Sequence, residues 1–435
     1  MAPRLRLAVF HNLPHGGGAR RAMTELCARL SAAHELDLFT VSSAEHGLFS
    51  LAPWVKRIFV YEEPPPPQHG RPLGFLNGAS PIRQQQRAAR LGRQIAADVD
   101  ARDYDIVFAH HCQLTHGPAL LPHLRTPSVY LCHEPLRTSY EPLLESRSAP
   151  APRRYRLRGA VHDALLRRSR RAQRNFDAHC AKAATVLLAN SYYSREALFR
   201  TYGRFARVLY LGVDVGRFRP LGLSRENCVL SVGMLVPHKG HDLVIESLAR
   251  LPAGIRPRLE IIAPAEVPGE ADYLRELAAR RGVSLDLHRG ISDEELVVHY
   301  NRARLCIYAP VMEPFGLVPL EAMACATPVV GVREAGLRET VISGETGLLV
   351  ERDAGELASA VETLLRDRST AEAMGRAGRR WVAAHWSWDR AAHDLIRLFH
   401  STVRDGGSDG AVNPHRKLEY ARLSGALPAV DSPGA

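Results

Sequence analysis

Short apolar runs alternate with helical segments in both halves of the chain. The first half has four runs of strand length and the second half has five, at residues 5–10, 36–41, 106–109 and 129–132, and at 228–233, 258–263, 283–288, 305–310 and 328–332. Such alternation predicts parallel, doubly wound sheets. Two series of similar size therefore predict an α/β protein with two Rossmann-like domains. Sheets of this class bind ligands at the carboxyl ends of their strands.

Helical periodicity is clear at two places. After the first predicted strand, apolar residues recur at i, i+3, i+4 and i+7, at Met23, Leu26, Cys27 and Leu30. After the 283–288 run, Ser292 and Glu295 stand at the spacing of a capping box, which marks a helix start.

We expect four segments along the chain. These are an N-terminal domain over 1–217, a C-terminal domain over 218–385, a helix over 386–403 that returns to the N-terminal domain, and a disordered tail over 404–435. The tail is predicted to be disordered because its composition is turn-rich and weakly apolar. Residues 62–80 form a Pro/Gly-rich loop outside the repeating pattern.

Composition narrows the class of partner and the compartment. The 435 residues carry 57 Lys plus Arg against 46 Asp plus Glu, a net charge of +11, which favours anionic partners. The seven cysteines include no pair at CxxC spacing, so we expect buried thiols in a reducing compartment. No run reaches the roughly 18 apolar residues of a spanning helix, and the first apolar run leads into glycines rather than a cleavage site. We therefore expect a cytoplasmic protein.

Two loops follow strands at matching corners of the two predicted domains. The first, HNLPHGGGARR, brings glycine amides to a helix start, where an anion can bind. It does not fit the dinucleotide pattern, because Arg21 stands where a third glycine is needed, and a plain tight turn is the alternative. In the second, SVGMLVPHKGHDLV, Lys239 precedes a helix that begins near His241. That lysine can neutralise a diphosphate, or it can be an ordinary surface lysine.

The stretch EPFGLVPLEAMA places Glu313 and Glu321 on either side of a helix start near Gly316–Pro319. Taken singly, Glu321 in the first turn complements the helix dipole and Glu313 is an exposed carboxylate. The free amides of residues 315–318 form an anion site between the two acids. A ligand that places phosphate at these amides and hydroxyl groups at each acid is a nucleotide sugar.

These motifs together resemble glycosyltransferase family 4, retaining enzymes of the GT-B fold, over nearly the whole chain up to about Phe399. The resemblance is carried by NLPHGGGARR, CHEP, ANSYYSRE, LGVD, the HKG element, ISDEEL, EPFGLVPLEAMA and TGLLV. The CHEP form and the GGAR loop are most similar to mannosyltransferase-like members. The family implies an acceptor domain followed by a donor domain, with the ligands in the cleft between them.

The resemblance also implies residue roles. Glu321 would accept hydrogen bonds from the donor ribose, Glu313 would face the transferred sugar, and His133 would lie near its reacting face. The phosphates would be held by Lys239 and by backbone amides, with the nucleobase near Gly290; the amides are those of Gly17, Gly18, Phe315, Gly316 and Leu317. No motif marks the acceptor-binding residues.

Two positions depart from the family pattern. Met234 stands where the family usually has an arginine at the diphosphate, and Ala19–Arg20 stands where many members have an acid. No D-x-D element precedes the site, so we expect no cofactor and no required metal.

The function we expect is transfer of a hexose, with mannose favoured, from a nucleotide-diphosphate donor to a hydroxyl of a glycan or glycolipid. The alternatives are a nucleotide-sugar 2-epimerase of the same fold and an inactive polyanion-binding relative. Residues 151–175 carry nine arginines and one acid. This charge predicts either a solvated helix or a contact with the anionic inner face of a membrane. Nucleic acid is disfavoured because the segment has few aromatic residues for base stacking.

Overall fold

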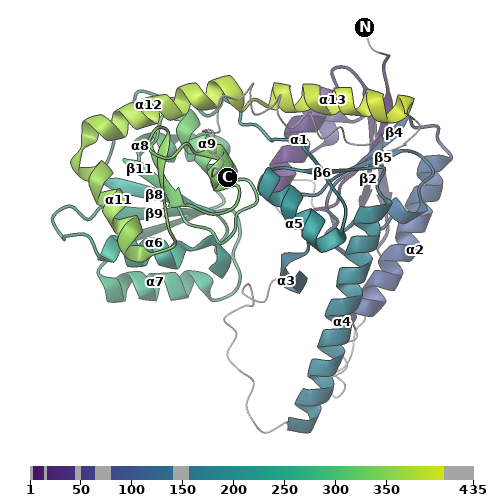
Figure 1. Ribbon diagram of the computed structural model, residues 1–435, viewed down its shortest axis with the longest axis horizontal. Coiled ribbons are helices and arrows are strands. Elements are labelled where there is room, and N and C mark those ends of the chain that lie inside the picture. The colour runs from purple at the N-terminus through teal and green to yellow at the C-terminus, as the bar shows by residue number, and fades with distance from the viewer. Residues whose placement is uncertain (1–2, 14–16, 45–49, 64–79, 141–155, 406–435) are drawn as a thin grey trace, which may run out of the picture.

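Two parallel sheets form the framework of the protein (Figure 1). The computed structural model describes residues 3–13, 17–44, 50–63, 80–140 and 156–405. Except for Arg404 and Asp405, the predicted tail lies outside these described residues, as does most of the 62–80 loop. The GT-B fold predicted from the sequence is confirmed.

The N-terminal sheet has seven strands and the C-terminal sheet has six, and all pairings between these strands are parallel. In spatial order the first consists of β3 (Arg57–Tyr61), β2 (Glu35–Val41), β1 (Arg6–Phe10), β4 (Ile106–Ala109), β5 (Ser128–Leu131), β6 (Val186–Ala189) and β7 (Arg207–Val208). The second consists of β10 (Leu285–Arg289), β9 (Arg258–Ala263), β8 (Cys228–Val232), β11 (Leu305–Tyr308), β12 (Val329–Val332) and β13 (Gly347–Val350).

Helices flank both sheets. They are α1 (Gly18–Leu30), α2 (Ser80–Asp100), α3 (Arg137–Tyr140), α4 (Arg156–Ala183), α5 (Tyr192–Tyr202), α6 (His241–Ala249), α7 (Glu270–Arg281), α8 (Asp293–Arg302), α9 (Leu317–Ala324), α10 (Leu337–Thr340), α11 (Ala354–Arg366), α12 (Arg368–His385) and α13 (Trp388–Arg404). None of the described helices is long and apolar enough to span a bilayer.

Strand order reverses between β1 and β4 in the first sheet and between β8 and β11 in the second. At such a switch point the two following loops separate and leave room for a ligand. The loop after β1 carries the glycines, and the loop after β11 carries Glu313 and leads into α9, which carries Glu321. The topology therefore assigns the predicted motifs to the ligand-binding ends of the sheets.

The predicted helix faces form as expected. Met23, Leu26, Cys27 and Leu30 of α1 are fully buried, because the 3.6-residue period puts them all toward the sheet. The seven cysteines are free and buried. At α8, Ser292 and Glu295 make both hydrogen bonds of the predicted capping box.

Helix α13 ties the end of the C-terminal half to the N-terminal domain. It follows α12 and runs alongside α1 (Figure 1). The rings of Phe399 and Phe108 of β4 meet edge to face at 5.5 Å, and Arg29 of α1 pairs with Asp389 at 2.6 Å. The last helix thus completes the core of the domain that the chain builds first.

Candidate active site

Helix α9 begins directly after the loop that carries Glu313. Gly316 has a φ of +96°, a left-handed conformation that favours glycine, and it turns the chain into the helix. Pro319 lies in the first turn, where its missing N–H costs no hydrogen bond. The prediction that Glu321 also lies in the first turn is wrong. The helix starts at Leu317, so Glu321 falls in the second turn, with its carboxylate buried.

Glu313 is paired with Lys239, the residue predicted to bind the diphosphate. Lys239 Nζ lies 2.8 Å from Glu313 Oε2, and the two side chains are only 19% and 16% exposed. Burial alone would raise the pKa of Glu313. The ammonium of Lys239, with a further contribution from Arg137, outweighs it and holds that pKa below its ordinary value. Glu313 is therefore a buried, ionised carboxylate rather than the exposed one that the simplest alternative predicts.

Lys239 reaches this position from a short 3₁₀ turn, Pro237–Lys239, that leads into α6. Gly240 has a φ of +69°, and an added Cβ there would lie 2.0 Å from the carbonyl oxygen of Ala309. The close approach of the two backbones, which only glycine allows, holds the lysine loop against the end of β11.

Glu321 is held by two polar groups. The Tyr300 hydroxyl donates to Glu321 Oε2 at 2.9 Å, and Arg21 Nε lies 3.6 Å from Oε1. Burial raises the pKa of Glu321, although the charge of Arg21 and the Tyr300 hydroxyl act in the opposite direction. The two acids of one motif thus sit in different electrostatic surroundings.

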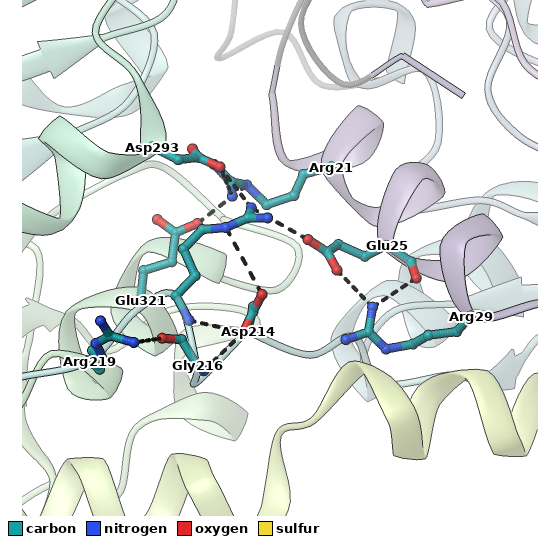
Figure 2. A network of polar contacts seen from close by, with 9 residues as sticks. Arg21, Glu25, Arg29, Asp214, Gly216, Arg219, Asp293 and Glu321 are labelled. Atoms are coloured by element: carbon teal, nitrogen blue, oxygen red, sulfur yellow. Dashed lines mark hydrogen bonds and ion pairs between the residues drawn. The ribbon is translucent and has the colours of Figure 1, made fainter. Parts of the chain in front are cut away.

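Arg21 comes from the other domain and joins the two halves of the molecule. It sits in the second turn of α1 and donates to both oxygens of Asp293 at the start of α8, at 2.9 Å and 2.5 Å. The ion pairs continue from Asp293 to Arg217 at 2.9 Å and from Arg217 to Glu25 at 3.6 Å. Figure 2 shows Arg21, Asp293, Glu25 and Glu321 gathered in this region. The resulting network spans the domain interface beside Glu321.

The predicted glycine loop lies against the start of α9. A Cβ added at Gly18 would stand 3.0 Å from the Leu317 side chain. Gly17 caps α1 with a φ of +153°. The structure therefore brings the N-terminal ends of α1 and α9 together across the interface, and both expose positive helix ends to the same region.

His133 follows β5 and is buried among other histidines. Its Nε2 lies 2.7 Å from His110 Nε2, and Asn190 contacts its Nδ1 at 3.1 Å. Burial lowers the pKa of His133 to about 4, so the ring is neutral near pH 7. Asn190 accepts from Ser194, whose hydroxyl lies 3.5 Å from the carbonyl of Pro314. A polar chain therefore links His133 to the loop of Glu313.

Two further residues predicted to bind the donor, Phe315 and Gly290, have other surroundings. The Phe315 side chain is buried, with its ring centroid 5.6 Å from that of Trp386, so only its backbone is available to a donor. Gly290 follows β10 with a φ of +64° and leads to Ser292 and Asp293 at the start of α8. Its loop is thereby connected to the Arg21 network.

Several site residues are not evident from the sequence. The sequence marks Arg21 only as the residue that breaks a dinucleotide pattern, and it indicates no role for Tyr300 or Asp293. Arg137 was also missed; it follows the CHEP element and donates to the carbonyl of Val311 at 3.0 Å. Arg21 and Arg137 bring two cations from the N-terminal domain to a site where Met234 leaves the C-terminal domain without its usual arginine.

Comparison with known proteins agrees with this architecture. Residues 16–217 match the family model described as Glycosyltransferase Family 4, and residues 217–381 match the one described as Glycosyl transferases group 1. The chain has the GT-B architecture and belongs to glycosyltransferase family 4.

The chain spans only part of the length of two curated relatives that it matches. The chain is 35% identical over 240 residues to a GDP-mannose-dependent alpha-(1-6)-phosphatidylinositol monomannoside mannosyltransferase of Mycolicibacterium smegmatis, covering 49% of this chain and 62% of that protein. It is 35% identical over 246 residues to a D-inositol 3-phosphate glycosyltransferase of Geodermatophilus obscurus, covering 51% and 54%.

The fold extends further than the sequence similarity. The structure of sucrose-phosphate synthase from Thermosynechococcus elongatus superposes with a TM-score of 0.71 at 21% identity, covering 92% of this chain and 100% of that chain.

Proposed function

We propose that this protein transfers a hexose from a nucleotide-diphosphate donor to a hydroxyl group of a glycan or glycolipid. The observation that carries the proposal is the arrangement around α9. A buried acid lies on each side of the helix start, each acid has a cation beside it, and the glycine loop of the other domain faces the same helix end. Phosphates would lie at the helix ends and Lys239, and sugar hydroxyls would lie at the acids.

The chemistry follows from where charge develops. As the anomeric bond breaks, the leaving nucleoside diphosphate gains negative charge and the sugar becomes oxocarbenium-like. Lys239 and the amides of Gly316 and Leu317 stabilise the leaving group, because fixed dipoles in a buried site need no reorganisation. The ionised Glu313 carboxylate orients the sugar hydroxyls and favours the positive ring.

The stereochemical course belongs to the same proposal. Members of the family retain the anomeric configuration, and we infer the same course here. His133 would act as a neutral hydrogen-bonding group near the reacting face, because its low pKa keeps it unprotonated. The leaving phosphate would take the proton of the acceptor hydroxyl, and no side-chain nucleophile or metal is invoked.

Donor and acceptor classes are chosen from the relatives. The Mycolicibacterium relative is named as GDP-mannose-dependent, and both relatives' names contain an inositol unit. GDP-mannose and an inositol-bearing phospholipid are therefore the first donor and acceptor to test. Unlike the substrate-binding groups around α9, these identities rest on names alone.

The direct experiment incubates the protein with a panel of nucleotide sugars, with and without acceptor. The proposal expects a glycosylated acceptor whose new linkage keeps the donor's anomeric configuration, read by NMR coupling constants. Epimerised donor formed without acceptor would instead establish the epimerase alternative. Absence of transfer, hydrolysis and epimerisation across the panel would indicate a binding relative.

A membrane contact through α4 is part of the proposal. Arg167, Arg168, Arg170, Arg171 and Arg174 are exposed along this helix. Each cation near an anionic surface contributes about 1 kcal/mol, so five of them are sufficient for reversible attachment at the inner face of a membrane. Sedimentation with liposomes tests the contact: binding must require anionic lipid and fall with salt, and equal partition with neutral vesicles would exclude it.

A further inference from the structure

A group of metal-ligating side chains lies in the C-terminal domain, away from the acids of the α9 motif. Glu260 on β9, His288 on β10 and His299 on α8 each offer a ligand atom, and these atoms all lie within 4.8 Å of one another. Strands β9 and β8 separate β10 from β11, the strand that leads to Glu313. The group is therefore distinct from the candidate active site.

The sheet register explains the convergence. Glu260 pairs with Asp286 across the β9–β10 ladder, so His288, two residues further along β10, points to the same face of the sheet. Helix α8 covers this face and contributes His299, whose Nδ1 lies 2.8 Å from Glu260 Oε2. Side chains from two adjacent strands and one helix thus converge at one point.

The histidine side chains are suited to a ligand. The ring centroids of His288 and His299 are 4.7 Å apart, and His288 Nε2 is buried with no hydrogen-bond partner among the described residues. A buried nitrogen without a partner is unfavourable, and a bonded ligand removes this cost. His299 is 22% exposed and gives the site access to solvent.

The carboxylate is held in place through both of its oxygens. His299 Nδ1 lies 2.8 Å from Glu260 Oε2. Arg258 donates to Glu260 Oε1 at 2.5 Å, which directs Oε2 toward the histidines. Arg258 also pairs with Glu226 at 3.2 Å and Asp286 at 3.0 Å, so three carboxylates surround this guanidinium. Its charge is more than neutralised.

We propose that Glu260, His288 and His299 bind one divalent transition-metal ion such as Zn²⁺. Two imidazole nitrogens and a carboxylate oxygen are a ligand set that Zn²⁺ accepts, with bonds of about 2.0–2.2 Å. Arg258 then acts as the outer hydrogen-bond donor that holds the carboxylate in place.

The position of the site gives the ion a structural role. His288 lies just before the loop of Gly290, and His299 lies in the helix that follows it. A bound ion would join the two ends of this loop and hold α8, whose first residue, Asp293, anchors Arg21. The metal would stiffen the donor side of the interface without touching a substrate.

The test measures zinc binding by the full-length protein. Metal-free protein is dialysed against Zn²⁺, and bound metal is counted by mass spectrometry. The proposal expects one tightly bound ion per chain, with binding weakened at least ten-fold in His288→Asn and in His299→Gln. His393→Gln, at an exposed histidine on α13, should bind like the wild type. Circular dichroism establishes that each variant is folded.

A second measurement guards against variants that misfold. Co²⁺ added to metal-free wild-type protein should give the visible absorption of a histidine- and carboxylate-bound ion, and Zn²⁺ should remove it. Absence of a stoichiometric ion in the wild type, or zinc binding that survives both histidine substitutions, would overturn the proposal and leave Glu260–His299 as an ion pair only. Neither result depends on the proposed transferase activity.

Discussion

Glu313 and Glu321 lie in one motif and are both buried, yet their pKa values shift in opposite directions. Lys239 touches Glu313 at 2.8 Å, whereas Arg21 stands 3.6 Å from Glu321 and is shared with Asp293. The closer and less divided cation favours the ionised form more strongly. This difference supports the proposal that Glu313 acts at the developing cation and that Glu321 recognises hydroxyl groups.

The role of Glu313 predicts a kinetic signature. In Glu313→Ala, kcat should fall by about 10²–10³, the usual effect of losing one electrostatic stabiliser, whereas donor affinity should change less. Steady-state kinetics and donor titration measure the two effects separately. Glu345→Ala, at an exposed acid of the same domain, is the control. Equal losses of kcat and donor affinity, or no loss, would contradict the assignment.

Buried neutral histidines predict acid sensitivity. Burial lowers the pKa of both His133 and His241 to about 4. The unfolded chain, with an ordinary pKa near 6.5, therefore binds more protons as pH falls from 6.5 toward 4. Stability should drop in that window, by about 2 kcal/mol for each histidine between pH 7 and pH 5.

Thermal unfolding followed by circular dichroism checks this pH dependence. The Tm should be lower at pH 5 than at pH 7, and His241→Gln should reduce the difference, whereas exposed His393→Gln should not. A Tm that is the same at both pH values would show that these rings are not kept neutral by burial.

The residues of the site were predictable where a motif fixes them and not where the fold brings them together. Glu313, Glu321 and Lys239 stand at recognisable spacings, and Lys239 does meet Glu313. Arg21 lies 272 positions from Asp293, and no spacing rule links an arginine in one domain to an acid in another. The same holds for Tyr300, whose hydroxyl is positioned by helix packing.

Helix α8 connects the capping box with Arg21 and Glu321. Its capping box orients the first turn, Asp293 in that turn holds Arg21, and Tyr300 near its end holds Glu321. A poorly formed start of α8 would therefore disturb the domain interface.

Removing the cap gives a local prediction. Ser292→Ala should cost about 1 kcal/mol and make amide exchange in the first turn of α8 roughly five-fold faster. Hydrogen exchange read by mass spectrometry resolves this segment. Ser359→Ala, on the exposed side of α11, should leave exchange in α8 unchanged. Unchanged exchange after loss of Ser292 would mean that packing alone holds the helix start.

Most strands in the interior of the sheets were predictable from the sequence, whereas β3, β6, β7 and β13 were not. β4 and β9 have the predicted bounds, although β9 carries Arg258 and Glu260 among its apolar residues. β3 was missed because it is an edge strand with an exposed face, including Ile58 and Val60. β7 has only two residues, too few for any periodicity.

At the scale of the whole molecule, two sets of contacts connect the domains. Helix α13 packs on α1, and the Arg21 network joins α1 to α8 (Figure 2). The first buries Phe399 and adds the Arg29–Asp389 pair, whereas the second consists of ion pairs with a cation shared between Asp293 and Glu321. The ionic connection is the one that a ligand at Glu321 would disturb.

Loss of Arg21 should loosen the interface. Arg21→Ala removes charge-assisted bonds worth about 1.5–3 kcal/mol, so the domains should separate more often and the radius of gyration in X-ray scattering should rise. Arg275→Ala, which breaks an exposed pair with Asp272 on α7, should scatter like the wild type. Identical scattering of all three proteins would show that the network does not hold the domains.

The relative position of the domains was the least predictable feature. Local patterns define each sheet, but the contacts between the sheets join residues more than a hundred positions apart, such as Ser191 with Pro314. The family resemblance implies a cleft between the domains, whereas the contacts of Arg21 and Arg137 across the interface follow only from the folded structure.

The most direct test of the account is calorimetric titration of GDP-mannose and the other nucleotide sugars into three proteins. Wild type should bind one donor at a single site, and both Glu321→Ala and Lys239→Ala should bind it at least ten-fold more weakly, as expected for loss of charge-assisted bonds of about 1.5–3 kcal/mol. Glu345→Ala should match the wild type. Donor affinity that is unchanged in both site variants, or no binding of any donor to the wild type, would contradict the claim that this interface holds a nucleotide-diphosphate sugar.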